Sequence, residues 1–134
     1  MSTLAAIGIE MPNGTVRAIG LQYAGYPAHA GVILAGYYRD QKKVEALIAL
    51  GGLDTIGLDV NSEETAAYNR DMEGEFFDPK EFRNAEAFWD CAEDYFQAVW
   101  LYLYQGGKWY CKGYSDTEVF ELDAIFENDN KKEK

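Results

Sequence analysis

Paired segments of strand-forming residues stand near both ends of the chain. Residues 4–10 and 16–23 are rich in such residues and flank a Pro-Asn-Gly-Thr turn sequence. Asn-Gly tolerates the positive φ angles of a tight hairpin turn. Residues 99–104 and 108–114 alternate between apolar and polar side chains around a Gln-Gly-Gly turn sequence. We therefore predict one β-hairpin near each end of the chain.

Between these hairpins, apolar side chains recur at every third or fourth position, which is the period of a helix buried on one face. The first such stretch, residues 27–37, starts at a proline, which suits a first helical turn. The second, residues 41–50, has Asp40 placed to cap its start and Gly51 placed to end it in a left-handed conformation. We predict a helical hairpin packed on the first sheet and closed by a short turn over residues 53–57.

A third helix is predicted over residues 85–96, with Asn84 as its cap. Its apolar face comprises Phe88, Trp89, Ala92, Tyr95 and Phe96. The segments around it give weaker signals. Residues 63–68 are interpreted as a strand or a loop, residues 69–83 as a loop with a short strand near 80–83, and residues 119–126 as a strand passing into a short helix.

The order of these elements, β-β-α-α-(β)-(β)-α-β-β-(β/α), predicts an α+β fold. We expect a mainly antiparallel sheet with the helices packed on one face. The chain of 134 residues is long enough for one ordinary domain and contains no linker, so residues 1–126 are assigned to a single domain. Residues 127–134 are polar and are predicted to form a charged, flexible tail.

The charge of the chain narrows the class of partner. The formal net charge is -11 and the isoelectric point about 4.4. Nucleic acids and anionic membranes are bound by clustered Lys and Arg, so neither is expected as a direct partner. A partner chosen by charge would be basic. We see no secretion signal, no apolar stretch that could span a membrane and no cysteine framework, and a bacterial cytoplasm is the expected compartment.

The helical hairpin resembles a family of small proteins from phages and prophages. The matching sequence is GYP at residues 25–27, KVEALIALG at 43–51 and IG at 56–57. Further similarity lies in NRD at 69–71 and in the segment 82–96. The resemblance implies a setting, a mobile-element accessory protein in a bacterial cell, rather than an activity.

The chain departs from that family at two places. Members usually carry Cys-His-Trp-Asp just before Gly-Tyr-Pro, whereas residues 20–24 here read GLQYA. The family element G-R-D-x-G-E is also altered, because Asp71 is followed by Met-Glu-Gly-Glu. If these elements form the family's ligand site, the site is lost or changed in this chain.

Catalytic and metal-binding patterns are weak. His29 is the single histidine, so a Cys-His pair has one possible base in the chain, and Cys91 stands among the acidic residues Asp90, Glu93 and Asp94, which would not activate a thiol. The alternating Asp71, Glu73, Glu75 and Asp78 lack the glycine and terminal glutamate spacing of a calcium loop. The glycine pairs do not form a phosphate-binding loop. We therefore expect no enzyme activity, no cofactor and no metal.

The feature that most favours a specific function is a band of acidic residues in the second half of the chain. On the third predicted helix Glu86, Asp90 and Glu93 are spaced i, i+4 and i+7 and share one face, where like charges repel. One interpretation is an ordinary solvated surface; the other is a surface that imitates a phosphate backbone and blocks a basic nucleic-acid-binding site on a host protein, as anti-CRISPR inhibitors do. The band comprises Asp71, Glu73, Glu75, Asp78, Glu81, Glu86, Asp90, Glu93 and Asp94.

An alternative site is a set of aromatic and arginine side chains. Tyr rings stack on nucleobases, and the Arg guanidinium binds phosphate. Such residues would suit a protein that sequesters a nucleotide immune signal in a pocket, either within one chain or at the interface of a homo-oligomer. Ordinary packing in the core and at its rim is the competing interpretation. The set comprises Tyr23, Tyr26, Tyr37, Tyr38 and Tyr68, with Arg39 and Arg70.

Overall fold

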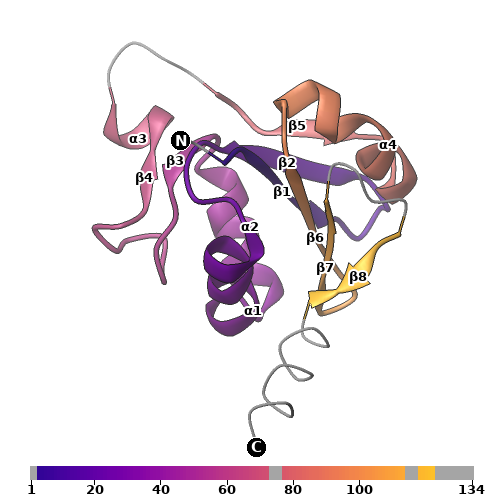
Figure 1. The fold of residues 1–134 in the computed structure, drawn as a ribbon, viewed down its shortest axis with the longest axis horizontal. Coiled ribbons are helices and arrows are strands. Elements are labelled where there is room, and N and C mark those ends of the chain that lie inside the picture. Colours follow the sequence, from indigo (N-terminus) through magenta and orange to yellow (C-terminus); the bar gives the residue numbers. More distant parts are fainter. Residues whose placement is uncertain (1–2, 73–76, 114–117, 123–134) are drawn as a thin grey trace, which may run out of the picture.

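A mixed sheet with helices packed against it forms the centre of the molecule (Figure 1). The computed structural model describes residues 3–72, 77–113 and 118–122. In this part of the chain the sheet has eight strands and is mostly antiparallel, so the predicted α+β class is confirmed. The strands are β1 (Ala5–Glu10), β2 (Val16–Leu21), β3 (Leu53–Thr55), β4 (Ala66–Ala67), β5 (Lys80–Phe82), β6 (Trp100–Gln105), β7 (Lys108–Gly113) and β8 (Phe120–Glu121). The helices are η1 (Pro27–Gly31), α1 (Val32–Tyr37), α2 (Gln41–Ala49), α3 (Tyr68–Asp71) and α4 (Ala85–Phe96).

The strands follow the order β4-β3-β2-β1-β6-β7-β8, and β5 pairs with β2 beside this path. Both predicted hairpins are confirmed, since β1 pairs antiparallel with β2 and β6 with β7. Gly14 at the first turn and Gly106 and Gly107 at the second have positive φ angles of 88°, 61° and 83°. In the centre of the sheet β1 and β6 run parallel and bring the two hairpins side by side.

The helix starts were also predicted correctly. The Asp40 carboxylate accepts a hydrogen bond from the Lys43 N–H at 2.8 Å, and the Asn84 side chain accepts one from the Ala87 N–H at 2.8 Å. The helix predicted from residue 27 begins with the π-helical turn η1 and continues into α1.

The turn predicted over residues 53–57 is wrong in its first half, because Leu53–Thr55 forms β3. The Gln22 N–H donates to the Leu53 carbonyl at 2.9 Å, and β3 runs parallel to β2 at this point. Three residues are too few for an alternating pattern to be recognised, and the pairing with β2 is non-local. The ambiguous segments resolve as β4 at 66–67 and β5 at 80–82, whereas α3 was not predicted. Residues 73–76, 123–126 and the predicted tail 127–134 lie outside the described residues.

The placement of all helices on one face of the sheet is also wrong. Ile7 and Ile9 of β1 belong to the core cluster beneath α1 and α2. Ala6 belongs to a second cluster, which contains Phe88 and Ala92 of α4 on the opposite face (Figure 1). Gly8 lies under α4 too, and a Cβ there would meet the Phe88 ring at 3.0 Å. A short strand that is apolar at every position is typical of burial on both faces.

The joint between α1 and α2 is fixed by two aromatic side chains of the second hairpin. The Trp109 indole N–H donates to the Tyr38 carbonyl at 2.8 Å, and the Tyr104 hydroxyl donates to the Arg39 carbonyl at 3.1 Å. Both rings are buried and pack against each other at 5.2 Å between centroids. The helical hairpin is therefore fastened to the far hairpin, not only to the first.

Two further buried tyrosines fix the outer ends of the same helical unit. The Tyr102 hydroxyl donates to the Gly25 carbonyl at 2.6 Å, just before η1. The Tyr38 hydroxyl donates to the Gly57 carbonyl at 2.9 Å, just after β3. Burial favours the neutral phenol, and it raises the pKa of Tyr102 strongly and that of Tyr38 to about 12.

Candidate functional site

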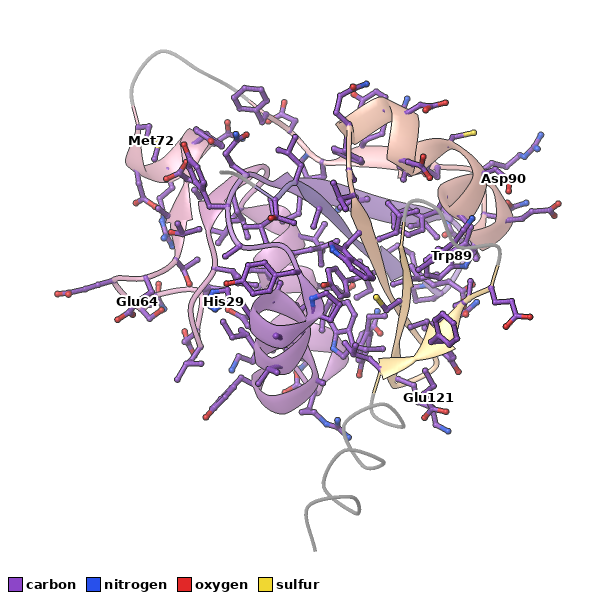
Figure 2. All side chains as sticks on the ribbon, in the orientation of Figure 1. His29, Glu64, Met72, Trp89, Asp90 and Glu121 are labelled. Carbon is purple, nitrogen blue, oxygen red and sulfur yellow. The ribbon has the colours of Figure 1, made fainter. Side chains whose placement is uncertain are left out.

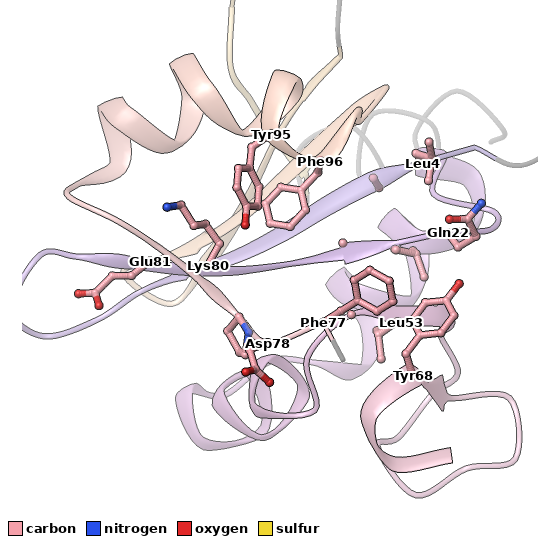
Figure 3. Close-up of a pocket in the computed structure, with 15 residues that line it drawn as sticks. Leu4, Gln22, Leu53, Tyr68, Phe77, Asp78, Lys80, Glu81, Tyr95 and Phe96 are labelled. Atoms are coloured by element: carbon pink, nitrogen blue, oxygen red, sulfur yellow. The ribbon is translucent and has the colours of Figure 1, made fainter. Parts of the chain in front are cut away.

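A cleft of about 750 Å³ lies on the α4 side of the sheet, at the outer edge of β2 (Figure 3). β5 pairs with β2 at residues 16–18 and β3 pairs with it at Leu21. The interval between these two pairings opens into the cleft, with Gly20 in its lining. The missing side chain of Gly20 also makes room for the Phe96 ring, which a Cβ would meet at 3.2 Å.

Aromatic pairs form two sides of the cleft. Tyr68 and Phe77 lie on one side with their ring centroids 5.0 Å apart. Tyr95 and Phe96, at the end of α4, lie on the other side with centroids 4.8 Å apart. β2 runs between the two pairs (Figure 3). The cleft is therefore a groove with ring systems facing it from two separate elements.

The Phe77 wall is held by backbone contacts with the end of α2 and with α3. The Phe77 N–H donates to the Asn69 side chain at 2.7 Å, and the Phe77 carbonyl accepts from the Gly52 N–H at 2.7 Å. A Cβ on Gly52 would lie 2.8 Å from the Cβ of Phe77, so a larger residue there would displace the ring. Gly51, whose φ of 81° ends α2 as predicted, would meet the Phe77 carbonyl in the same way.

Polar groups stand around the cleft with a small excess of negative charge. The Tyr68 hydroxyl donates to Asp54 at 2.9 Å, and Asp78 accepts from the Asn69 amide at 3.1 Å. The Lys80 ammonium lies over the Tyr95 ring, 5.2 Å from its centroid. Glu81 is exposed at the same side. The charged side chains in the lining are thus Asp78, Lys80 and Glu81.

The acidic band is divided in the structure. Asp71 is paired with Arg70 at 2.9 Å, and this contact lowers the pKa of the Asp71 carboxyl. Asp78 and Glu81 lie at the cleft. Glu73 and Glu75 lie outside the described residues. The remaining members are on α4: Glu86, Asp90, Glu93 and Asp94.

The α4 carboxylates lie on the side of the helix away from the sheet. Phe88 and Ala92 face the core, while Glu86, Asp90 and Asp94 are exposed; Asp90 points outward in Figure 2. In the part of the chain that the structure describes, none of these three carboxylates has an ion-pair partner. The last turn of α4, which is described in full, contains no basic residue. Negative charge at a helix C-terminus is unfavourable, so this surface is not arranged for helix stability.

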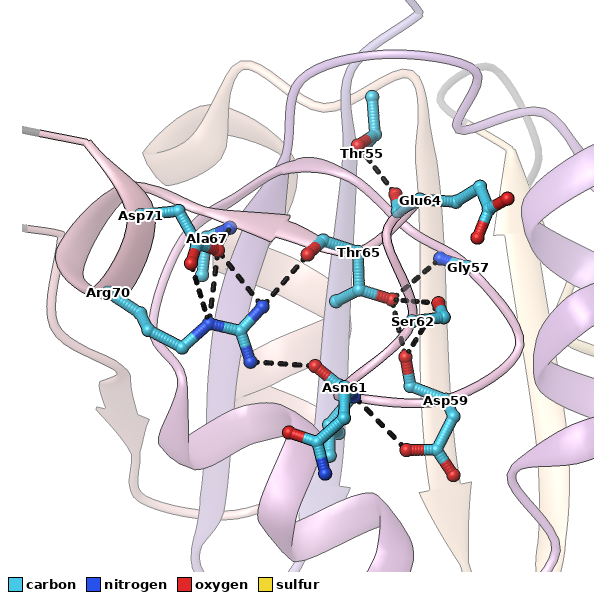
Figure 4. A network of polar contacts seen from close by, with 11 residues as sticks. Thr55, Gly57, Asp59, Asn61, Ser62, Glu64, Thr65, Ala67, Arg70 and Asp71 are labelled. Atoms are coloured by element: carbon cyan, nitrogen blue, oxygen red, sulfur yellow. Dashed lines mark hydrogen bonds and ion pairs between the residues drawn. The ribbon is translucent and has the colours of Figure 1, made fainter.

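The alternative aromatic and arginine set is not brought together as one pocket. Arg70 holds the loop before β4: its Nη1 donates to the Val60 carbonyl at 2.6 Å and its Nη2 to the Thr65 carbonyl at 2.8 Å (Figure 4). The Thr65 hydroxyl is the hub of the same loop, where it donates to the Asp59 carbonyl and accepts from the Gly57 N–H. The contacts of the Arg70 guanidinium therefore hold this loop in place.

Arg39 lies apart from the cleft, at the joint of α1 and α2, where it donates to the Ala35 carbonyl at 2.8 Å. Tyr23 and Tyr26 are exposed before η1, Tyr37 is exposed on α1 and Tyr38 is buried. Tyr68 is the one member of the alternative set that lines the cleft.

The remaining candidates are the histidine and the two cysteines, and none of them is part of the cleft. His29 is half-buried, with its ring centroid 6.2 Å from that of Tyr26. Cys91 is exposed on α4 and Cys111 is buried in the core, and both are unbridged. Within the described residues, no three His, Cys, Asp or Glu side chains come together as a metal site. None of the described helices is both long and apolar enough to cross a membrane.

Sequence reasoning missed the cleft itself. Phe77 was not singled out, and Tyr95 and Phe96 were placed on the buried face of their helix although Tyr95 is 58% exposed. The available signal was the aromatic surplus at the end of α4, since one helix face cannot bury four large rings against a short sheet.

Comparisons of this chain with protein-family models, with curated proteins and with solved structures find no match. The resemblance to the phage and prophage family therefore stays a prediction.

Proposed function

We propose that this protein acts by binding, as a phage or prophage accessory protein whose acidic surface occupies a basic nucleic-acid-binding site of a host protein. The surface is the outer side of α4, and the partner is recognised by charge. Inhibition of a bacterial defence system, as by an anti-CRISPR protein, is the role that fits the family resemblance and the net charge of -11.

The observation that carries the proposal is the unneutralised row of carboxylates on α4. Glu86, Asp90 and Asp94 follow one another at intervals of four residues and are all exposed. Like charges at this spacing destabilise a helix by about 0.2–0.5 kcal/mol per pair. A helix shaped for stability alone would carry a Lys or Arg among them, so a binding role gives the arrangement a reason.

The test uses purified bacterial defence effectors that bind nucleic acid, CRISPR effector complexes among them, in DNA- or RNA-binding and cleavage assays. The wild-type protein is expected to inhibit at least one effector, less strongly as salt increases. Reversal of these three helix charges together, Glu86→Lys, Asp90→Lys and Asp94→Lys, should raise the inhibitory concentration by about 100-fold, because like charges would then face each other across the interface.

The matched control is a second triple reversal, Glu45→Lys, Glu63→Lys and Glu64→Lys, which changes the net charge equally. Glu64 lies on the opposite side of the molecule from Asp90 in Figure 2. The control should inhibit like the wild type. Equal loss of inhibition in both triple variants would mean that net charge rather than α4 matters. Absence of inhibition throughout the panel, or undiminished inhibition by the α4 variant, rejects the proposal.

A further inference from the structure

We propose that the cleft at the outer edge of β2 binds a planar heteroaromatic ring compound that carries no negative charge, such as a nucleobase or nucleoside. This inference concerns a different surface from the acidic side of α4 and does not depend on the proposed function. It rests on the walls, the floor and the charge of the cleft.

The walls suit a flat ring. Phe77 is 48% exposed and Tyr95 is 58% exposed, although both belong to ring pairs that border the same concavity. Large aromatic side chains left in solvent at a concave site mark a surface that gains by being covered. The volume of about 750 Å³ lies in the range of pockets for small molecules. Aromatic side chains stack on heteroaromatic rings with little dependence on the identity of the base.

The floor supplies a backbone hydrogen-bond donor for the edge of such a ring. The Gln22 N–H points to the outer edge of β2, where it donates to the Leu53 carbonyl. Since N–H groups along a strand alternate between its two edges, the Gly20 N–H points to the same outer edge. Gly20 lies in the interval between β5 and β3 and lines the cleft, as does Gln22. Because the Gln22 N–H is already engaged by Leu53, the Gly20 N–H is the donor that would recognise a ring nitrogen or carbonyl oxygen.

The charge around the cleft selects against phosphate. Asp78 and Glu81 are carboxylates, and Lys80 is the one cation in the lining that the structure describes. The Lys80 ammonium already lies on the face of the Tyr95 ring. An anionic phosphate placed here would meet a net negative charge, whereas a neutral or cationic ring would not. A nucleotide recognised through its phosphates is therefore not the ligand that this cleft favours.

The test is a titration of the full-length ¹⁵N-labelled protein with adenosine, guanosine, cytidine and uridine, followed by NMR. At least one nucleoside should give saturable shifts that centre on the backbone amides of Gly20, Phe77 and Tyr95. The matching 5′-triphosphate should bind more weakly. Shifts that are absent for all four nucleosides, or tighter binding of the triphosphate, overturn the inference.

Variants of the exposed wall residues separate stacking in the cleft from binding elsewhere. Tyr95→Ala and Phe77→Ala should each weaken nucleoside binding by about tenfold, the lower part of the range for losing a base–aromatic stack. Tyr37→Ala is the matched control, because Tyr37 is 48% exposed on α1 and does not line the cleft. Unchanged affinity in both wall variants overturns the inference. The triple reversal on α4 should bind the nucleoside like the wild type, which keeps this result distinct from the inhibition test.

Discussion

The two faces of the sheet are covered in different ways. On the face under η1, α1 and α2, buried Tyr and Trp side chains donate hydrogen bonds to backbone carbonyls at each joint of the helical unit. On the other face α4 is held by ring packing, in which Phe88 meets Phe82 at a centroid distance of 5.7 Å and Phe96 meets it at 6.4 Å. The first cover thus has four directional contacts to backbone carbonyls in addition to its buried area, whereas the second depends chiefly on ring packing, with one longer contact of 3.4 Å from the Lys112 ammonium to the Trp89 carbonyl.

We call the face covered by η1, α1 and α2 the scaffold side. The face covered by α4 is expected to tolerate substitution better. A buried carbonyl that loses its donor is costly, so the positions of α1 and α2 depend on particular atoms of β6 and β7. Ring packing tolerates substitution on the solvent side of the helix, because only volume and area must be kept. The acidic row and the aromatic cleft both lie on this second side, where surface changes cost the fold least.

The largest loss of stability is expected from a substitution of Trp109, on the face covered by α1 and α2. Trp109→Ala removes a fully buried ring and leaves the Tyr38 carbonyl without its donor, so it should lower the free energy of unfolding by about 3–5 kcal/mol. Tyr95→Ala, on the α4 side, removes a side chain that is 58% exposed and should change it far less. Urea unfolding followed by circular dichroism measures both. Similar losses in the two variants would contradict the division into two sides.

A smaller effect is expected for a single hydroxyl on the scaffold side. Tyr38→Phe leaves the Gly57 carbonyl unpaired in the core and should cost about 1–3 kcal/mol at pH 7. Tyr37→Phe is the control, since Tyr37 is exposed one position earlier in the chain. Urea unfolding of both variants at pH 7 gives the comparison, and equal stability of the two would show that the buried bond does not hold the hairpin.

The dependence of stability on pH offers a second test of the buried Tyr38 hydroxyl. Burial raises the pKa of Tyr38 from 10.0 to about 12, so the neutral phenol is favoured in the folded state. The stabilisation that Tyr38 contributes is fully present below pH 10. It is lost as the pH rises towards 12, because the Tyr38 phenol ionises at a lower pH in the unfolded chain than in the folded protein. The advantage of the wild type over Tyr38→Phe should therefore shrink across that interval. An advantage that stays constant from pH 9 to pH 12 would contradict the assignment.

The smallest effect on stability is expected on α4, and it should differ between the two ends of the helix. Asp94→Lys places a positive charge in the last turn and should stabilise the protein by about 0.5–1 kcal/mol at low salt. Glu86→Lys makes the same charge change in the first turn, where it opposes the helix dipole, and should give no gain. Thermal unfolding at low and at 1 M salt tests this, because screening should remove the difference. Equal shifts at both positions would mean that net charge, not helix position, governs the surface.

Local features of the fold could be predicted from the sequence. The turn at Gly14, the turn at Gly106 and the caps Asp40 and Asn84 each depend on a few neighbouring residues, and each was predicted correctly. The exact turn type was not predicted at the first hairpin, because Gly14 has a positive φ but Asn13 does not, and the Met11 N–H donates to the Thr15 carbonyl across a three-residue loop.

Features that depend on distant segments could not be predicted in the same way. Leu53 becomes a strand residue because it meets β2, and nothing within three residues encodes that meeting. The second covered face of the sheet was readable in principle from Ala6 and Gly8, which leave room for the Phe88 ring. The cleft required side chains from three separate segments, among them Phe77 and Tyr95, to be placed beside one strand.

The parallel pairing of β1 with β6 has a consequence for how the chain is made. Ala5 pairs with Trp100, so the central ladder joins two segments that leave the ribosome 95 residues apart (100 − 5). Until β6 emerges, Ile7 and Ile9 have one unpaired strand edge beside them, and the helical unit lacks the donors of Tyr102, Tyr104 and Trp109. Contacts of such long sequence separation slow folding. The nascent chain thus stays incomplete until late in synthesis, and a ribosome stalled before residue 100 would display a protease-sensitive intermediate rather than a folded half.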